Sequence, residues 1–167
     1  MYLTVVPTKI SSRLAGSDQV DKLEFQSEAI SFNPQRGNPF NHEVGNIGQT
    51  NAHFVGVELY ETSDRFERPP LVSSFYTLEV ENPHIHAYRL KLEPGTSTGP
   101  VQYDYPGFII AVSSGKLEIQ AGDKKALVHE LAPADWQWHD GQMELSVSNK
   151  GDTMFEAVIY HLPKRLP

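Results

Sequence analysis

The feature that most constrains the fold of this sequence is the way proline and glycine divide it. Its 167 residues include 12 prolines and 12 glycines, which separate short stretches that alternate in polarity or are rich in β-branched and aromatic side chains. Such stretches between turn residues are typical of β-strands, and none has the period of a long helix. We therefore predict an all-β chain that forms a sandwich or a small barrel. The predicted strands are residues 2–6, 22–26, 54–59, 75–80, 86–92, 108–112, 116–120, 126–130, 143–147 and 154–160.

The composition excludes several classes of partner and of site. The chain has 14 basic and 21 acidic residues, a net charge of −7, and its lysines and arginines are scattered singly. Since nucleic-acid binding needs a clustered basic face, we expect no nucleic-acid partner. No stretch approaches the roughly 20 apolar residues of a membrane span, so we expect no membrane partner and, by default, a cytoplasmic protein. Because there is no cysteine, any metal must be held by His, Asp, Glu or backbone oxygen.

An internal repeat links the two ends of the chain. Val5 aligns with Val112 at an offset of 107 residues, and the turn that begins at Asn46 aligns with the one that begins at Asn149 at an offset of 103. An apolar strand follows each turn. The second copy has about 30 further residues of predicted strand ahead of the matched region, and the first copy has none. We infer that the first copy lacks the opening strands of the second.

The repeat predicts the domain organisation. We expect a partial barrel at residues 1–60, a charged and proline-rich linker at 61–73 and a complete barrel at 74–163. A partial barrel would leave unpaired strand edges and an open apolar face. Three alternatives remain for what covers this apolar face: the chain's own second barrel, a second copy in a homodimer, or residues of a longer natural protein that precede Met1. Among partners of other chains, we expect the homodimer.

Two stretches of the second copy carry a resemblance to a known family. The first opens with Pro94-Gly95 and ends at the hairpin glycine Gly115; the second begins around Pro133 and ends at Asn149. They resemble the two signature stretches of the cupin superfamily. The resemblance implies that the second copy folds as a double-stranded β-helix, a jelly-roll barrel.

The same resemblance implies where metal ligands would lie. The family's glutamate position is occupied by Phe108 and the position of its last histidine by Leu145. Its two earlier histidines fall on Gln102 and Asp104, or in the other register on Val101 and Tyr103. Such a set holds neither zinc nor iron well, so we expect no cofactor in the complete barrel. In the partial copy, His42 lies four residues before Asn46 and keeps the late histidine.

Three histidines are candidates for an unconventional metal site. His84 and His86 form an HxH pair that would share one face of a strand, and His139 lies beside an aspartate. Such a site would hold zinc, iron, manganese or nickel. The pair precedes the Pro-Gly turn, however, and His86 and Tyr88 share their parity with apolar residues. We therefore favour a polar and aromatic lining at one end of the barrel over metal binding.

Two further groups are candidates for ligand contacts. Gln102 and Asp104 share a parity and would face the barrel interior, with Asp104 as a candidate general base, unless this stretch serves only as a turn. Trp138 and His139 belong to a tryptophan-rich stretch. It would suit a sugar or another flat ligand, although a barrel end or a dimer interface is the interpretation we favour.

The residues leave two hypotheses for function. The favoured one is a non-catalytic, metal-free module that binds a small polar ligand or serves assembly, with ligand contacts from His86, Tyr88, Gln102, Asp104, Trp138 and His139. The alternative is a metal-dependent cupin-type enzyme, a dioxygenase, isomerase or decarboxylase, acting on a small acid or sugar.

Overall fold

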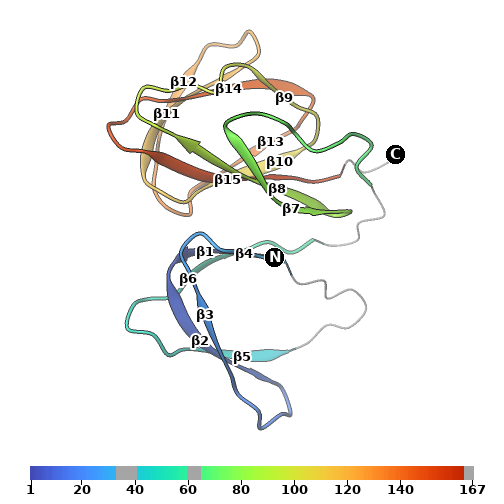
Figure 1. Cartoon of the computed structure of the whole chain (residues 1–167), viewed down its shortest axis with the longest axis vertical. Helices are drawn as coiled ribbons and strands as arrows, with labels where there is room; N and C mark the ends of the chain where they lie inside the picture. Colours follow the sequence, from blue (N-terminus) through green and yellow to red (C-terminus); the bar gives the residue numbers. More distant parts are fainter. Residues whose placement is uncertain (33–40, 60–64, 164–167) are drawn as a thin grey trace. The chain divides into compact units, whose positions relative to one another are not determined.

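The computed structural model describes residues 1–32, 41–59 and 65–163. These residues form fifteen strands, which confirms the all-β prediction, and none of them lies in a helix that could cross a membrane. The chain divides into two compact units, Met1–Leu59 (unit 1) and Tyr60–Pro167 (unit 2) (Figure 1).

Unit 2 is a barrel of two sheets. The first sheet has the strand order β13-β10-β15-β8-β7 and the second has the order β12-β11-β14-β9. Side chains from both sheets, among them Leu90, Leu145, Val147 and Ile159, form one core. The strands are β7 (Tyr76–Asn82), β8 (Ile85–Leu92), β9 (Val101–Tyr103), β10 (Gly107–Ala111), β11 (Gly115–Ala121), β12 (Leu127–Leu131), β13 (Trp136–His139), β14 (Met143–Asn149) and β15 (Phe155–His161).

Unit 1 has two three-stranded sheets. Their orders are β4-β1-β6 and β3-β2-β5. Leu3, Val5 and Ile10 are its buried apolar residues. The strands are β1 (Tyr2–Val6), β2 (Thr8–Leu14), β3 (Asp21–Phe25), β4 (Ile30–Ser31), β5 (His42–Asn46) and β6 (His53–Gly56).

The strand pairing of unit 1 repeats that of β10 to β15 in unit 2. β1 lies between β4 and β6 as β10 lies between β13 and β15, and β2 lies between β3 and β5 as β11 lies between β12 and β14. The pair Ile10 and Asn46 in unit 1 corresponds to Leu117 and Asn149 in unit 2. These are the offsets of 107 and 103 found in the sequence, so the register confirms the repeat.

The described residues of unit 1 have no counterparts of β7, β8 and β9. In unit 2, β8 pairs with β15 and β9 pairs with β14. No described strand pairs with the corresponding edges of β6 and β5. Val44 is 48% exposed, whereas Val147, its equivalent on β14, is 1% exposed. Unit 1 is therefore a partial second barrel whose inner face is exposed at Val44 within the described part of the chain, although Ile10 on the same face is buried.

Each strand predicted from the sequence is present, with its ends displaced by a few residues. The sequence missed the strands that are very short or rich in polar residues. Alternation cannot be recognised over two or three residues. The missed strands are β2, β4, β5, β9 and β13.

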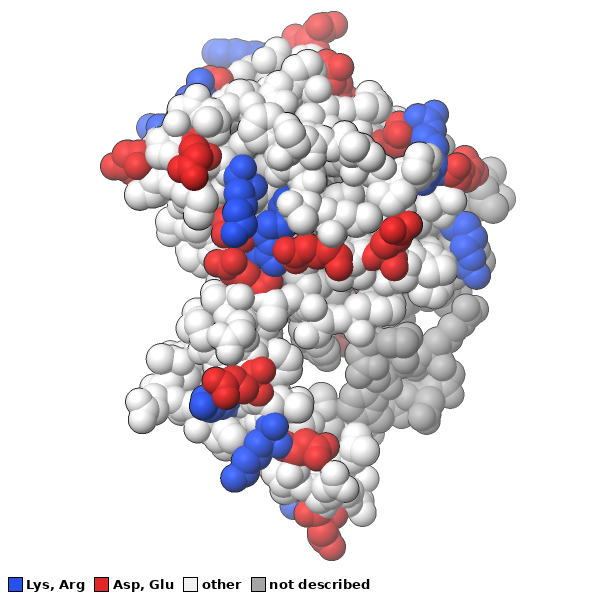
Figure 2. All heavy atoms as spheres, viewed as in Figure 1, with Lys and Arg blue, Asp and Glu red and all other residues white. Residues whose placement is uncertain are grey.

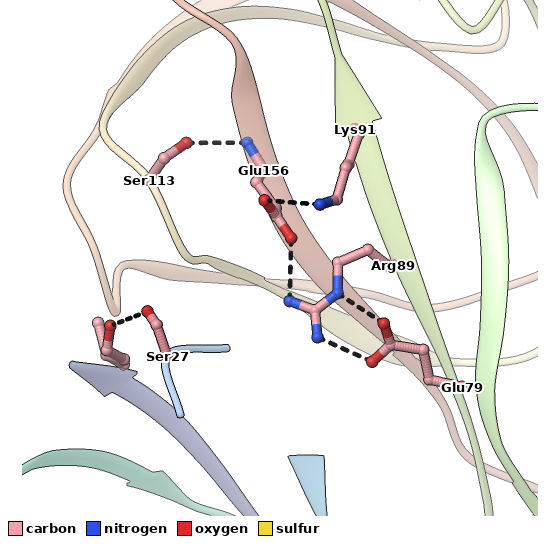
Figure 3. A network of polar contacts seen from close by, with 7 residues as sticks. Ser27, Glu79, Arg89, Lys91, Ser113 and Glu156 are labelled. Atoms are coloured by element: carbon pink, nitrogen blue, oxygen red, sulfur yellow. Dashed lines mark hydrogen bonds and ion pairs between the residues drawn. The ribbon is translucent and has the colours of Figure 1, made fainter. Parts of the chain in front are cut away.

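A network of ions joins β7, β8 and β15 (Figure 3). Arg89 donates two hydrogen bonds of 2.8 Å to Glu79 and one of 3.1 Å to Glu156. Lys91 lies 3.3 Å from the second carboxylate oxygen of Glu156, and the hydroxyl of Ser113 accepts a hydrogen bond from the Glu156 backbone N–H. The buried charges of Arg89 and Glu156 are thus compensated, as burial of charge requires.

Charged side chains of both signs are interspersed over the face shown in Figure 2. Several basic side chains are ion-paired with acidic ones, such as Lys91 with Glu156 and Lys9 with Glu24. The absence of a nucleic-acid partner stays a prediction.

The two equivalent turn asparagines provide a matched test of the barrel closure. Asn149 is fully buried and makes three hydrogen bonds, with Leu92 and Thr153 carbonyls and the Gly151 N–H. Asn46 repeats only the two local bonds and is exposed. At about 1 kcal/mol for each buried bond, Asn149→Ala should lower the free energy of unfolding by roughly 3 kcal/mol. Water can replace the two exposed bonds of Asn46, so Asn46→Ala should lower it by about 1 kcal/mol or less.

Urea denaturation followed by far-ultraviolet circular dichroism measures both losses, because strands of both units contribute to that signal. Tryptophan fluorescence reports unit 2 separately, because both tryptophans belong to it. Equal losses for the two variants would contradict the proposed contribution of the bond from Asn149 to β8.

Candidate functional site

A cavity of about 580 Å³ opens in unit 2 beside β9 and the segment 68–73. Its polar lining includes Arg68, Tyr88, Asp104, Tyr105 and His161. A second hollow of about 320 Å³ shares Arg68, Asp104 and Tyr105 with it. Volumes of this size are typical of sites for small molecules.

Two tyrosine hydroxyls hold the segment 65–73 against the barrel. The hydroxyl of Tyr105 accepts hydrogen bonds from the backbone N–H groups of Glu67 and Arg68, both at 2.6 Å. The hydroxyl of Tyr88 accepts one from Leu71 at 2.9 Å. Residues 65–73 of the predicted linker thus pack on unit 2, and residues 61–64 lie outside the described residues, so the linker itself stays a prediction.

Side chains of the same segment also pack on the barrel. Arg68 is ion-paired with Asp104 at 2.5 Å. The ring of Phe66 stacks on His86 with 3.5 Å between centroids and meets Tyr105 edge-on at 4.9 Å. The segment thus forms one wall of the cavity and covers His86.

Behind the cavity lies a cluster of buried histidines and tyrosines. The ring centroids of His139 and His161 are 5.5 Å apart, and each lies about 5 Å from that of Tyr103. His86 is linked to this group through Tyr88, whose hydroxyl lies 3.4 Å from His86 Nδ1 and whose ring centroid is 5.1 Å from that of His161. Strands β8, β9, β13 and β15 each supply part of the cluster.

Burial keeps these imidazoles neutral. Burial lowers the pKa of His161 to about 3, and the neighbouring His139 and His86 add to the effect. Burial likewise lowers the pKa of His139 to about 4, against the opposing charge of Asp140. Both ring nitrogens of His139 and the Nε2 of His161 are buried without a hydrogen-bond partner. A neutral imidazole offers one donor and one acceptor. Of these atoms, the Nε2 belongs to His161, which lines the cavity, whereas His139 does not.

Gly107 allows the two histidine-bearing strands, β13 and β15, to approach β10 closely from its two sides. In β10 it is opposite His139 on one side and His161 on the other. A Cβ at this position would lie 1.8 Å from the Tyr160 carbonyl oxygen and 3.0 Å from His139 Nε2. A larger residue would therefore displace β15 and the cluster.

The structure brings together several of the predicted ligand residues. Tyr88, Gln102 and Asp104 line the cavity, and His86 and His139 belong to the cluster behind it. Trp138 does not join them, since its ring is half exposed and packs on Phe108.

The predicted orientation of Gln102 is wrong. Tyr103 is fully buried, whereas Gln102 is exposed, so the inward positions of β9 are Val101 and Tyr103. Asp104 is only partly buried, and its carboxylate is paired with Arg68. The sequence fitted both registers of this short strand equally well.

The two histidines of the predicted HxH pair do not lie on the same strand. His84 lies in the turn between β7 and β8, where its N–H donates to Asn82, whereas His86 is on β8. His42 lies on β5 of unit 1 with its Nδ1 3.3 Å from the Ser12 hydroxyl. Among the residues that the structure describes, no three His, Asp or Glu side chains are placed to hold one metal ion.

Sequence reasoning missed His161. It ends β15 on the same face as Ile159, a core residue. The alternation of the predicted strand 154–160, extended by one residue, would have placed it inside the barrel.

Three comparisons with known proteins address the family. No family model matches the chain, and no curated protein matches it. Among solved structures it is similar to a cupin domain from Bordetella pertussis Tohama I, at 18% identity over 59% of this chain and 99% of that one, with a TM-score of 0.50. It is also similar to AerE from Microcystis aeruginosa, at 10% identity over 98% of this chain and 77% of that one, with a TM-score of 0.58. An RmlC-like cupin family protein with a double-stranded β-helix fold, from Methanocaldococcus jannaschii, has 13% identity over 64% of this chain and 94% of that one, with a TM-score of 0.47.

The chain has the cupin fold.

In this fold, the inward-facing positions that the family resemblance assigns to metal ligands are apolar or aromatic. Tyr103 and Leu145 are buried in the core, and Val101 is packed against it. Phe108 is buried between Trp138 and Tyr160. A metal-free complete barrel stays a prediction.

The buried imidazoles predict how stability depends on pH. Both histidines have a lower pKa in the folded chain than the value of about 6.5 in the unfolded chain. The unfolded chain therefore binds more protons in that window, and stability should be constant above about pH 7 and fall as the pH drops from 6.5 toward 4. Chemical denaturation at a series of pH values measures the slope of the free energy of unfolding against pH.

Replacing either histidine should reduce by one the number of protons that the chain takes up when it unfolds in this pH range. His139→Gln and His161→Gln should each flatten the slope between pH 6 and 4.5, and the double variant should flatten it most. An unchanged slope in the double variant would show that other groups cause the acid sensitivity.

Proposed function

We propose that unit 2 is a small-molecule binding barrel and that the cavity beside β9 is its binding site. The observation that carries the proposal is the combination of this cavity with a nitrogen of His161 that has no partner. An unpartnered buried polar atom costs about 1–3 kcal/mol, which a hydrogen bond from a bound molecule offsets.

The rest of the lining supports the same proposal. Most of the wall is apolar or aromatic, including Leu71, Tyr88 and Val101, and a few polar groups converge on the space. Sites for small ligands have this composition, because apolar contact gives affinity and a few hydrogen bonds fix orientation. The segment 65–73 limits access to the space from one side.

A binding screen tests the proposal. A library of small sugars, polyols, hydroxy acids and amino acids is screened by saturation-transfer difference NMR. Val101→Trp, which places a large ring in the cavity wall, should abolish the signal of each binder or weaken its affinity at least tenfold. The matched control Val128→Trp lies on β12, outside the cavity lining, and should bind as the unaltered protein does.

The proposal fails if no compound binds or if every binder is retained by Val101→Trp. The first outcome would exclude small-molecule binding as the function, and the second would exclude this cavity as the binding site.

A second candidate function, assembly of two copies, is favoured by the open inner face of unit 1. Tyr2 is 46% exposed, against 8% for its equivalent Ile109, and Val44 differs from Val147 in the same way. The edges of β5 and β6 carry backbone groups that no described strand pairs, and such edges bind other strands. A second copy of the chain would pair its own β5 or β6 edge with them around a two-fold axis.

Light scattering after size-exclusion chromatography tests assembly. The unaltered chain should elute as a dimer and Val44→Asp as a monomer, because a carboxylate on β5 would be buried without a partner. Val128→Asp, at an equally exposed valine of unit 2, should stay dimeric. A monomeric unaltered chain, or dissociation by Val128→Asp alone, would exclude this interface.

A further inference from the structure

The hydrogen-bonding capacity left open around the cavity defines the chemistry of its ligand. The hydroxyl of Tyr105 accepts two backbone hydrogen bonds, so both of its lone pairs are used. Only its own O–H remains, and none of the hydrogen bonds found among the described residues uses it. At this point of the wall a ligand must offer an acceptor.

The imidazole of His161 requires a different partner. It is 2% exposed, lines the cavity and has an unpartnered Nε2. Since its pKa is about 3, the ring is neutral at pH 7 and each nitrogen is either a donor or an acceptor. A hydroxyl group satisfies either tautomer, because it can donate and accept.

The charges on the wall cancel. Arg68 and Asp104 are the charged residues that line the cavity, and they are paired with each other. A carboxylate ligand would meet Asp104, and in the adjoining hollow also Glu67. An ammonium ligand would compete with Arg68 for the Asp104 carboxylate. A charged ligand would therefore lose hydration without gaining a free counter-charge.

We propose that the ligand of this cavity is an uncharged polyhydroxylated molecule, such as a monosaccharide or a cyclic polyol. Its hydroxyl groups accept from Tyr105, bond to His161 and reach the Arg68–Asp104 pair, while its C–H faces pack on the rings of Tyr88 and Tyr105. This inference rests on the proposed function, because it concerns the ligand of the same cavity.

Matched compounds that differ in charge test the inference. D-glucose and myo-inositol are the uncharged probes, glucuronate is the acid and glucosamine is the amine, and their affinities are measured by NMR titration of the full chain. The uncharged probes should bind at least tenfold more tightly than the acid and the amine. Preference for either charged probe, lost in Val101→Trp, would overturn the inference and leave the proposed function intact.

Two substitutions test which residues make the cavity prefer uncharged ligands over charged ones. Asp104→Asn frees Arg68, so affinity for glucuronate should rise at least tenfold relative to D-glucose, and since Asp104 is partly exposed the variant should fold. His161→Asn should weaken the uncharged probes at least tenfold, whereas His129→Asn, on β12 and outside the cavity lining, should not. An unchanged ratio in Asp104→Asn would overturn the charge argument.

Absence of binding by all of these probes also overturns the inference. The screen of the wider compound library then tests the proposed function separately, because any compound that binds there would belong to another chemical class.

Discussion

The pairing of β8 with β15 is the constraint on which the rest of unit 2 depends. It joins residues from Phe155 and Leu92 at one end to His161 and His86 at the other, and β9 closes the second sheet in the same way on β14. The described residues of unit 1 repeat the six later strands and include no counterparts of β7, β8 and β9. Val44 of unit 1 is half exposed, whereas its equivalent in unit 2, Val147, is buried. The difference shows how much the additional strands of unit 2 bury this position.

Closure of the barrel also creates the candidate site. β8 brings His86 and Tyr88, β9 brings Tyr103, and both meet His161 of β15. A cluster of neutral, aromatic and weakly polar groups has therefore replaced the apolar filling that a barrel of this size would otherwise contain. Such filling would be more stable, because apolar side chains leave no buried atom without a partner. The chain retains the less stable arrangement beside an open cavity, which is why we assign it to binding.

The sequence predicted the architecture better than the site, and the reason is physical. Strand alternation and the recurring asparagine turn are local patterns, and they were sufficient for the all-β fold and for the repeat with its offsets of 107 and 103. The site depends on which of two registers a three-residue strand adopts, and only pairing with β14 decides that Tyr103 rather than Gln102 points inward. His86 and Tyr88 were found because they lie on a long strand with clear parity. Phe66 was missed because its packing on His86 depends on contacts far apart in the sequence.

The contrast between the two polar groups of unit 2 supports the location of function. Arg89 and Glu156 are buried, yet every charge there has a partner: Arg89 contacts two carboxylates and Glu156 also contacts Lys91 (Figure 3). A network satisfied in this way holds strands together and has no capacity left for a ligand. His139 and His161 are equally buried and have three ring nitrogens without partners. Buried polar atoms in proteins are nearly always satisfied. Of these nitrogens, the Nε2 of His161 belongs to a residue that lines the cavity, which supports our proposal that a bound molecule completes the structure there.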